Sequence, residues 1–262
     1  MIHFWNGNKS AIRQAFELKV LQLALEQSVH SGEIYNDQTD YPRAEDEGNI
    51  FNLGADVLVT VAGNKKFAKT PFLQLPQPLC KGLLGCRVLI VHRHRQHNFA
   101  RLSEAQLKQM TVGIPATWAD ADLFRANQYP VLEQGSLEEM LIALQNGECD
   151  YMALGANEAE AILAQYASLA PDLIIEPSLL LYYPFPLVFY FHPQQQALLK
   201  ALQSGLQQAR ASGQLDQLFE QVYGADLAGL ALDQRRVFHL TNPILPATLA
   251  DYRSDLLPTE DN

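Results

Sequence analysis

Two strongly apolar segments, Arg87–Val91 and Leu187–Phe191, constrain the fold of this chain more than any other feature. Each is followed by a histidine and then by polar sequence, which is typical of a buried strand that reaches the surface. The roughly one hundred residues between them are enough for a domain. We therefore expect two crossings between two lobes, with a hinge and a ligand cleft there. Lobe 1 should comprise residues 1–90 and 193–262, and lobe 2 residues 91–192.

The rest of the chain alternates between strand-like and helix-like patterns, which predicts an α/β fold. Ile12, Phe16 and Val20, for example, recur at helical spacing. The main elements expected are strands at Ile2–Trp5, Asp56–Val61 and Cys149–Leu154, helices at Ala11–Ser28 and from Ser103 to Met110, and two C-terminal helices separated at Gly213.

The composition is that of an acidic globular protein. Its 29 Asp and Glu residues against 19 Lys and Arg residues leave a formal net charge of −10, which argues against nucleic acid as a partner. Apolar runs such as Ser178–Phe191, which contains two prolines, are too short and too broken to span a bilayer.

The first residues and the cysteines bear on the cellular compartment. The chain does not begin with a basic segment followed by an apolar stretch, so we expect no signal peptide in it. Residues 2–7 have the pattern of a first strand that would follow a cleaved leader. Cys80 and Cys86 lie six residues apart, which permits a disulfide in an oxidising compartment. For these two and Cys149 we favour buried thiols, because cysteine is often a small core residue.

Several motifs resemble, in order and spacing, those of the type II periplasmic solute-binding proteins. The resemblance is to the branch related to the amino-acid-binding components of ABC transporters, and it covers nearly the whole chain. The motifs are "GADVLVTV", "KGLLGCRVLIV" as the first crossing, "LSEAQLKQMTVGIPATWAD" as helix, strand and ligand loop, "LQNGECDYMALGANEAEAIL" as the far wall, and "LYYPFPLVFYFHP" as the return crossing. The resemblance implies a two-lobe α/β fold with a ligand cleft between the lobes.

Arg87 stands at the mouth of an expected interior strand, after Gly82 and Gly85. A guanidinium offers a planar fork that pairs with a carboxylate through two charge-assisted hydrogen bonds. The resemblance implies that Arg87 binds the ligand carboxylate, and the glycines would let backbone N–H groups approach the ligand. The alternative is that Arg87 only flanks the strand and pairs with a surface acid. If Arg87 serves the ligand, its removal should change the stability of the empty protein little.

The segment "GIPATWAD" matches the family's second ligand loop, which lies at a helix N-terminus. The resemblance makes Thr117 the counterpart of a residue that binds the ligand carboxylate. Trp118 is predicted either to stack on the ligand or to fill the core of its lobe. We expect Asp120 to be a helix cap and Asp122 a solvated surface residue, rather than ligand contacts.

The far wall departs from the family pattern. Amino-acid binders place an acidic residue shortly after the strand that matches Cys149–Leu154, where it holds the ligand ammonium. Gly155 or Ala156 occupies that place here. Glu158 is a candidate replacement, although an acid at a helix start is also favoured by the helix dipole. We therefore expect unmodified α-amino acids to bind weakly. Trp5 is a candidate for lining the cleft, with a core position as the alternative.

The segment "HRHRQH" raises the question of a metal site. His92 and His94 would share one face of a strand, but no nearby carboxylate or thiolate completes a ligand set with His97. We therefore favour a solvated basic segment and expect no metal site. The chain also lacks the motifs typical of common hydrolases, metalloproteases and nucleotide-binding enzymes.

These features predict an extracytoplasmic solute-binding protein that captures a small anionic or amino-acid-like solute by hinge closure for an ABC transporter. We expect a periplasmic monomer without cofactor, catalytic residues or nucleic-acid partner, which acts with a membrane permease or a receptor. The alternatives are the ligand-sensing domain of a signalling receptor and an enzyme on the same fold, such as a dehydratase.

Overall fold

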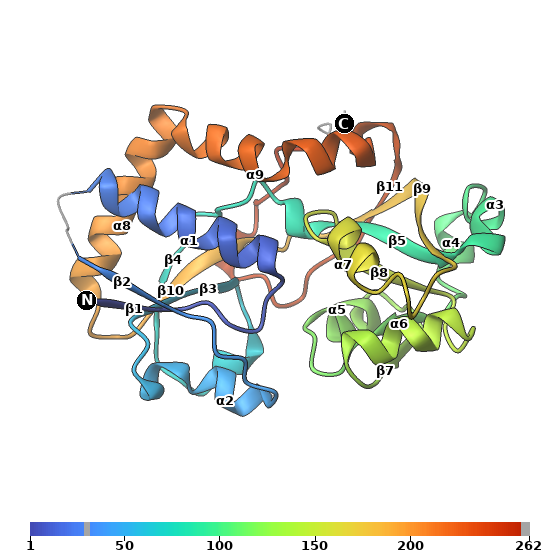
Figure 1. Ribbon diagram of the computed structural model, residues 1–262, viewed down its shortest axis with the longest axis horizontal. Coiled ribbons are helices and arrows are strands. Elements are labelled where there is room, and N and C mark those ends of the chain that lie inside the picture. The colour runs from blue at the N-terminus through green and yellow to red at the C-terminus, as the bar shows by residue number, and fades with distance from the viewer. Residues whose placement is uncertain (29–31, 258–262) are drawn as a thin grey trace. The chain divides into compact units, whose positions relative to one another are not determined.

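The computed structural model describes residues 1–28 and 32–257, and it divides the chain into two compact units (Figure 1). Unit 1 consists of Met1–Cys80, Pro186–Ala225 and Pro246–Ala250; unit 2 consists of Lys81–Phe185, Asp226–Leu245 and the tail from Asp251 onward. Both units are built from segments that are far apart in the sequence. The two-lobe α/β architecture expected from the sequence is therefore confirmed.

Unit 1 contains a five-stranded sheet with the strand order β2-β1-β3-β10-β4. The strands are β1 (Ile2–Trp5), β2 (Ile34–Asp37), β3 (Val57–Val61), β4 (Leu73–Leu75) and β10 (Leu187–Phe191). The first three run parallel, whereas β10 is antiparallel to both β3 and β4. The strand that follows the return crossing thus completes a sheet begun at the N-terminus.

The helices of unit 1 are α1 (Ala11–Glu26), α2 (Ala44–Gly48), α8 (Gln196–Ala211) and α9 (Gln214–Leu230), whose last residues belong to unit 2. One face of α1 is buried, in part against α9. Phe16 on α1 packs against the rings of Phe219 and Tyr223. Gly213 separates α8 from α9 in a left-handed conformation (φ 75°), as the sequence predicted.

Unit 2 contains a six-stranded sheet with the order β11-β9-β5-β8-β6-β7. Its strands are β5 (Cys86–His92), β6 (Val112–Ile114), β7 (Val131–Glu133), β8 (Tyr151–Gly155), β9 (Leu173–Tyr182) and β11 (Arg236–His239). Its helices are α3 (Gln96–Phe99), α4 (Glu104–Leu107), α5 (Asp120–Ala126), α6 (Leu137–Gln145) and α7 (Ala159–Gln165). Strand β5 is antiparallel to β8 and β9, while β6, β7 and β8 run parallel.

Each sheet contains a topological switch point, where the connections between neighbouring strands lead in opposite directions across the sheet. In unit 1, β1 lies between β2 and β3; in unit 2, β6 lies between β7 and β8. Open α/β sheets bind ligands outside the carboxyl ends of the strands at such a point. The loops that follow β1, β6 and β8 are therefore the expected positions of functional residues.

The structure places the unit boundaries differently from the sequence-based prediction. The boundary expected at residues 90/91 lies at 80/81, because β5 pairs with β8 and β9 rather than with strands of unit 1. The return boundary lies at 185/186 instead of 192/193, because β10 pairs with β3 and β4. Residues 226–245, which were assigned to lobe 1, join unit 2, because β11 pairs with β9.

Cys80, Cys86 and Cys149 are buried thiols, as expected. Burial raises the pKa of the Cys86 and Cys149 thiols to about 12, so neither is a reactive thiolate at neutral pH. Among the described residues, no helix combines the length and the apolar character needed to cross a membrane.

Candidate functional site

The first candidate site lies at one edge of the unit 2 sheet. Arg87 is at the amino end of β5, directly opposite Gly155 at the carboxyl end of the antiparallel β8. Arg87 therefore lies at the same edge as the loops that follow β6 and β8. The parallel β-α-β arrangement of the unit also brings the start of α5 to this edge.

Arg87 is held by a buried ion pair. Its side chain is 2% exposed, and Nη2 lies 2.7 Å from Oδ1 of Asp120, the first residue of α5. The Tyr183 hydroxyl donates a hydrogen bond to the same oxygen. The guanidinium carbon also lies 5.3 Å and 5.4 Å from the ring centres of Tyr183 and Phe185, within the range of cation–π contacts.

The surroundings favour the charged form of Arg87. Burial alone would lower the pKa of Arg87, but Asp120, assisted by Tyr183 and Glu158, outweighs burial and raises it. Burial raises the pKa of Tyr183 well above its usual value, so the hydroxyl remains a donor. Asp120 thus supplies the carboxylate partner that the sequence-based prediction assigned to a ligand.

The structure corrects the prediction for Asp120. It was expected to be a helix cap, but the N-cap position of α5 is Ala119, and Asp120 is buried against Arg87. Asp122 is exposed, as expected, with Oδ1 3.8 Å from Arg125. Arg87 does pair with an acid, but that acid is a buried one rather than a surface one.

The space beside Gly155, where the family resemblance implies an acidic ligand residue, is occupied by the side chains of Asn157 and Arg87. A Cβ atom on Gly155 would lie 2.4 Å from Oδ1 of Asn157 and 3.4 Å from Nη1 of Arg87, so a side chain there would have to displace the Asn157 side chain. Asn157 is 1% exposed, and neither of its amide atoms has a hydrogen-bond partner among the described residues. The same is true of Nε of Arg87. Buried polar atoms are nearly always paired, so these atoms are candidates for contact with a bound group.

Glu158 is buried at the N-cap position of α7, and its charge contributes to the raised pKa of Arg87. Arg87, Asp120, Asn157 and Glu158 are therefore brought together at one sheet edge. The sequence indicated Arg87 and Glu158 as separate candidates, without predicting that the two lie at the same site.

The other candidates in unit 2 occupy different surroundings. Gly82 has φ 79°, and a Cβ there would lie 2.7 Å from Cβ of Ser254, so the tail covers this glycine. Thr117 is exposed, with φ 69°, and its backbone N–H donates to Oε1 of Glu133 over 3.2 Å. Trp118 is half-buried. The ligand roles of these three residues stay predictions.

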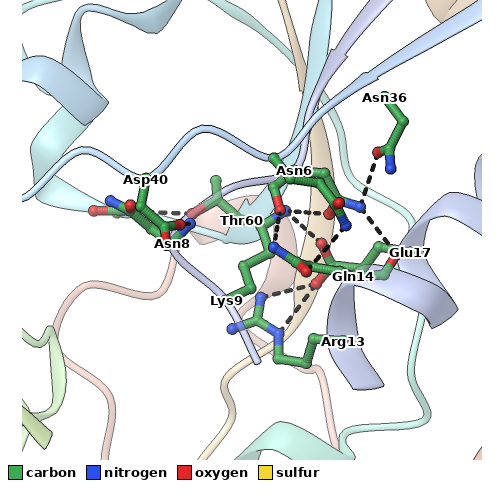
Figure 2. Close-up of polar contacts among 11 residues, drawn as sticks. Asn6, Asn8, Lys9, Arg13, Gln14, Glu17, Asn36, Asp40 and Thr60 are labelled. Carbon is green, nitrogen blue, oxygen red and sulfur yellow. Dashed lines mark hydrogen bonds and ion pairs between the residues drawn. The ribbon is translucent and has the colours of Figure 1, made fainter. Parts of the chain in front are cut away.

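A second polar cluster lies in unit 1, in the loop after β1 and the first turns of α1 (Figure 2). Glu17 is fully buried and accepts from two cations: Nζ of Lys9 at 2.5 Å and Nη2 of Arg13 at 2.8 Å. Asn6 and Gln14 hold the loop against the helix, because each donates its side-chain amide to the other's backbone carbonyl.

Burial acts strongly on this cluster. It lowers the pKa of Lys9 despite the opposing attraction of Glu17. When Lys9 is charged, two cations share one carboxylate at the carboxyl end of β1. The charge of Glu47 also opposes the lowering of the Lys9 pKa, so acids near this edge partly balance the two cations.

The neighbouring loops are tied to the same edge. The Asn8 side-chain amide donates to the carbonyl of Tyr41 and to Oε2 of Glu47. Glu47 also accepts from Nζ of Lys66 at 2.8 Å, in the segment after β3. Trp5 is buried, and its Nε1–H donates to the carbonyl of Thr39 at 2.9 Å, while its ligand role stays a prediction.

The sequence reasoning missed Lys9, Arg13 and Glu17. One signal was present: Arg13 and Glu17 are four residues apart on the expected helix, and Glu17 falls beside the apolar stripe that contains Phe16. An acid at the edge of a buried helix face needs a cationic partner, and Arg13 is one turn away.

Among the described residues, no group of three or more His, Cys, Asp or Glu side chains is arranged to hold a metal ion. His92 and His94 approach each other through their Nδ1 atoms at 2.6 Å, and His97 lies on α3.

Solved structures show which fold these units make. The chain matches a periplasmic His/Glu/Gln/Arg/opine family-binding protein from Silicibacter pomeroyi in complex with lysine (TM-score 0.59, 12% identity, 86% of this chain and 98% of that one). It also matches the amino acid ABC transporter substrate-binding protein AbpA from Streptococcus pneumoniae bound to L-arginine (0.56, 14%, 86% and 95%). A third match is the VFT2 domain of BvgS from Bordetella pertussis (0.59, 19%, 84% and 92%). The chain thus has the two-lobe fold of the type II periplasmic solute-binding proteins.

Comparisons of sequence alone add one relative. No family model matches the chain. It is 27% identical over 145 residues to the membrane-bound lytic murein transglycosylase F of Alcanivorax borkumensis, a match that covers 52% of this chain and 29% of that protein. The matched segment therefore spans less than a third of the length of this relative.

Proposed function

We propose that this chain is a solute-binding protein that captures a small polar solute without chemical conversion. The observation that carries the proposal is the placement of the two polar clusters. Each lies outside the carboxyl ends of parallel strands at the point where the sheet topology reverses, which is where open α/β sheets bind ligands. The fold, shared with amino-acid-binding proteins of ABC transporters, supports the same function.

The chemistry of the two clusters favours a solute with both charged and hydrogen-bonding groups. In unit 1, Lys9 and Arg13 place two cationic groups around the buried carboxylate of Glu17, and these cations are the proposed contacts for an anionic group of the solute. In unit 2, Arg87 offers Nε to a ligand oxygen while Asp120 holds its Nη2. The buried amide of Asn157 offers a donor and an acceptor beside it. Thr117, Trp118, Glu158, Gly82 and Trp5 remain proposed ligand residues.

Delivery to an ABC transporter outside the cytoplasm is the role we propose, with a membrane permease as partner. Sensing is the second candidate, because the fold is also that of the BvgS VFT2 domain and of a histidine kinase sensor domain. The two roles differ in their partner: a transporter component stimulates solute uptake by its permease, whereas a sensor changes the activity of a kinase.

A thermal-shift screen of amino acids, other carboxylates and small oligomers tests the proposal. A solute at about one hundred times its Kd should stabilise the folded state by about 2.7 kcal/mol and raise the unfolding midpoint by about 5–10 °C. Calorimetry should then give one site per chain, and mass spectrometry should recover the solute unchanged. If no solute shifts the midpoint, the binding function fails; if the solute is converted, the chain is an enzyme.

A further inference from the structure

A second ligand site is indicated on unit 2, on the segment that follows β5. Residues 92–103 contain three arginines, three histidines and no Asp or Glu, although the whole chain has a formal charge of −10. The segment begins at His92, the last residue of β5, whereas Arg87 lies at the opposite end of the same strand. This basic segment is therefore separate from the site around Arg87 (Figure 1).

The segment is anchored through two of its residues. Phe99 is fully buried and packs edge-on against Tyr151, with ring centres 6.0 Å apart. Arg95 pairs with Asp150 at 2.7 Å and lies over the ring of Phe99. These contacts anchor the backbone of the segment and leave the neighbouring His97 and Arg101 exposed on the surface.

A cavity of about 620 Å³ opens on this segment and is lined by His97, Asn98, Ala100, Arg101, Leu102 and Gln106. That volume is typical of small-molecule sites. Within residues 1–28 and 32–257, no hydrogen bond or ion pair engages the side chains of His97 and Arg101. Both are exposed and available to a ligand.

The lining presents hydrogen-bond donors. Oε1 of Gln106 accepts from the backbone N–H of Ser103 at 2.8 Å, in a capping box at the start of α4 that does not use the amide NH₂ group. Arg236 reaches the carbonyls of Leu102 at 2.6 Å and Ala100 at 3.4 Å, which adds a cation at the rim. The nearby Glu104 is paired with Lys108 at 2.8 Å.

We infer that this cavity binds the oxyanion of a phosphate-bearing molecule. A guanidinium, an imidazole N–H and an amide NH₂ form a donor set that matches phosphate oxygens, and arginine binds phosphate through two parallel hydrogen bonds. The same chemistry would serve a free small molecule or a lipid headgroup. The inference does not depend on the proposed solute-binding function, because no residue of the cavity belongs to either polar cluster.

Inorganic pyrophosphate is the probe, titrated into isotopically labelled protein at low salt and followed by backbone amide NMR. We expect saturable shifts in residues 97–106, and Arg101→Ala should weaken the binding reported by these residues at least about tenfold. His97→Ala should also weaken it, whereas Arg43→Ala, which removes an exposed arginine of unit 1, should leave the Kd unchanged. Absence of saturable shifts in this segment, or equal binding by wild type and Arg101→Ala, would overturn the inference.

Vesicles identify the source of the phosphate. Sedimentation with phosphatidylglycerol vesicles, and with phosphatidylcholine vesicles as control, is measured for wild type and Arg101→Ala. Arg101-dependent binding to the anionic vesicles assigns the site to a lipid headgroup. Pyrophosphate binding without vesicle binding assigns it to a soluble phosphate compound.

Discussion

The guanidinium of Arg87 and the carboxylate of Asp120 form a buried ion pair, with Nη2 and Oδ1 2.7 Å apart and both side chains less than a tenth exposed. The partners are 33 residues apart in the sequence and lie on different elements, β5 and α5. The pair ties the start of α5, and with it the Thr117 loop, to the central strand of unit 2. It therefore links the stability of this unit to the geometry of its candidate site.

Removal of Arg87 should destabilise the empty protein, contrary to the expectation from sequence. Arg87→Ala leaves Asp120 buried without its cation, which costs about 3–5 kcal/mol in the free energy of unfolding. The double variant Arg87→Met/Asp120→Leu removes both charges and should lose less than Arg87→Ala, because apolar replacement of a complete buried pair is often neutral and the remaining cost is mainly the Tyr183 hydroxyl without its acceptor. Urea denaturation measures both; equal loss in the two variants would show that the pair is not the cause.

The same double variant tests the ligand role of Arg87 in a folded protein. If Nε of Arg87 contacts the ligand, binding of the solute identified in the thermal-shift screen should weaken by about 2–5 kcal/mol. Calorimetry on the double variant gives this number directly. Wild-type affinity in that variant would limit Arg87 to a positioning role for α5.

Neutralisation of Glu17 should destabilise unit 1. Glu17→Gln leaves Lys9 and Arg13 without their shared carboxylate, and the expected loss is about 3–5 kcal/mol. Adding Lys9→Met to Glu17→Gln should recover part of it, because one uncompensated buried cation is removed. Additive effects of the two substitutions would argue against a shared network.

Lys9 should make stability depend on pH in the alkaline range. Its pKa is lowered in the folded state by burial, so the unfolded chain binds more protons between that value and about 10.4. The free energy of unfolding of wild type, relative to Lys9→Met, should therefore rise with pH across this window and level off above it. Urea unfolding of both proteins over the window provides the measurement; a flat or falling difference would contradict the assignment.

Unmodified α-amino acids should bind weakly, because Gly155 stands where the family resemblance implies an ammonium-binding acid and Asn157 occupies the space beside it. The charges of the buried acids Asp120 and Glu158 already act on Arg87, so an ammonium would lack a counter-charge of its own and lose much of its binding energy. Calorimetry with the common amino acids tests this, and submicromolar binding of any of them would overturn it.

The close approach of two helices in unit 1 provides a packing test. A Cβ on Gly205 of α8 would lie 1.8 Å from the carbonyl oxygen of Ala24 on α1. Gly205→Ala should therefore cost at least about 1–3 kcal/mol, the usual range for overpacking. Gly224→Ala on α9, where a new Cβ meets only the flexible tip of Glu220, should be neutral or stabilising. Similar unfolding midpoints for both variants would contradict the close packing.

The sequence by itself determined the local elements of this protein. The helical spacing of Phe16 and Val20 predicted α1, the apolar run at Leu187–Phe191 predicted β10, and Gly213 predicted the break between α8 and α9. These features are encoded within a few residues, as side-chain periodicity and backbone freedom, and can be recognised without knowledge of the rest of the chain.

Only the tertiary structure decided which elements pair and which charges meet. The sheet to which β5 belongs depends on hydrogen bonds with β8 and β9, and no local pattern distinguishes these from other apolar strands. From the sequence alone, Asp120 is expected to be an acid at a helix start, and only the fold places it beside Arg87. Glu17 similarly acquires Lys9 through the loop after β1. Pairings of this kind depend on the distance between side chains in space, which the fold sets and local periodicity does not contain.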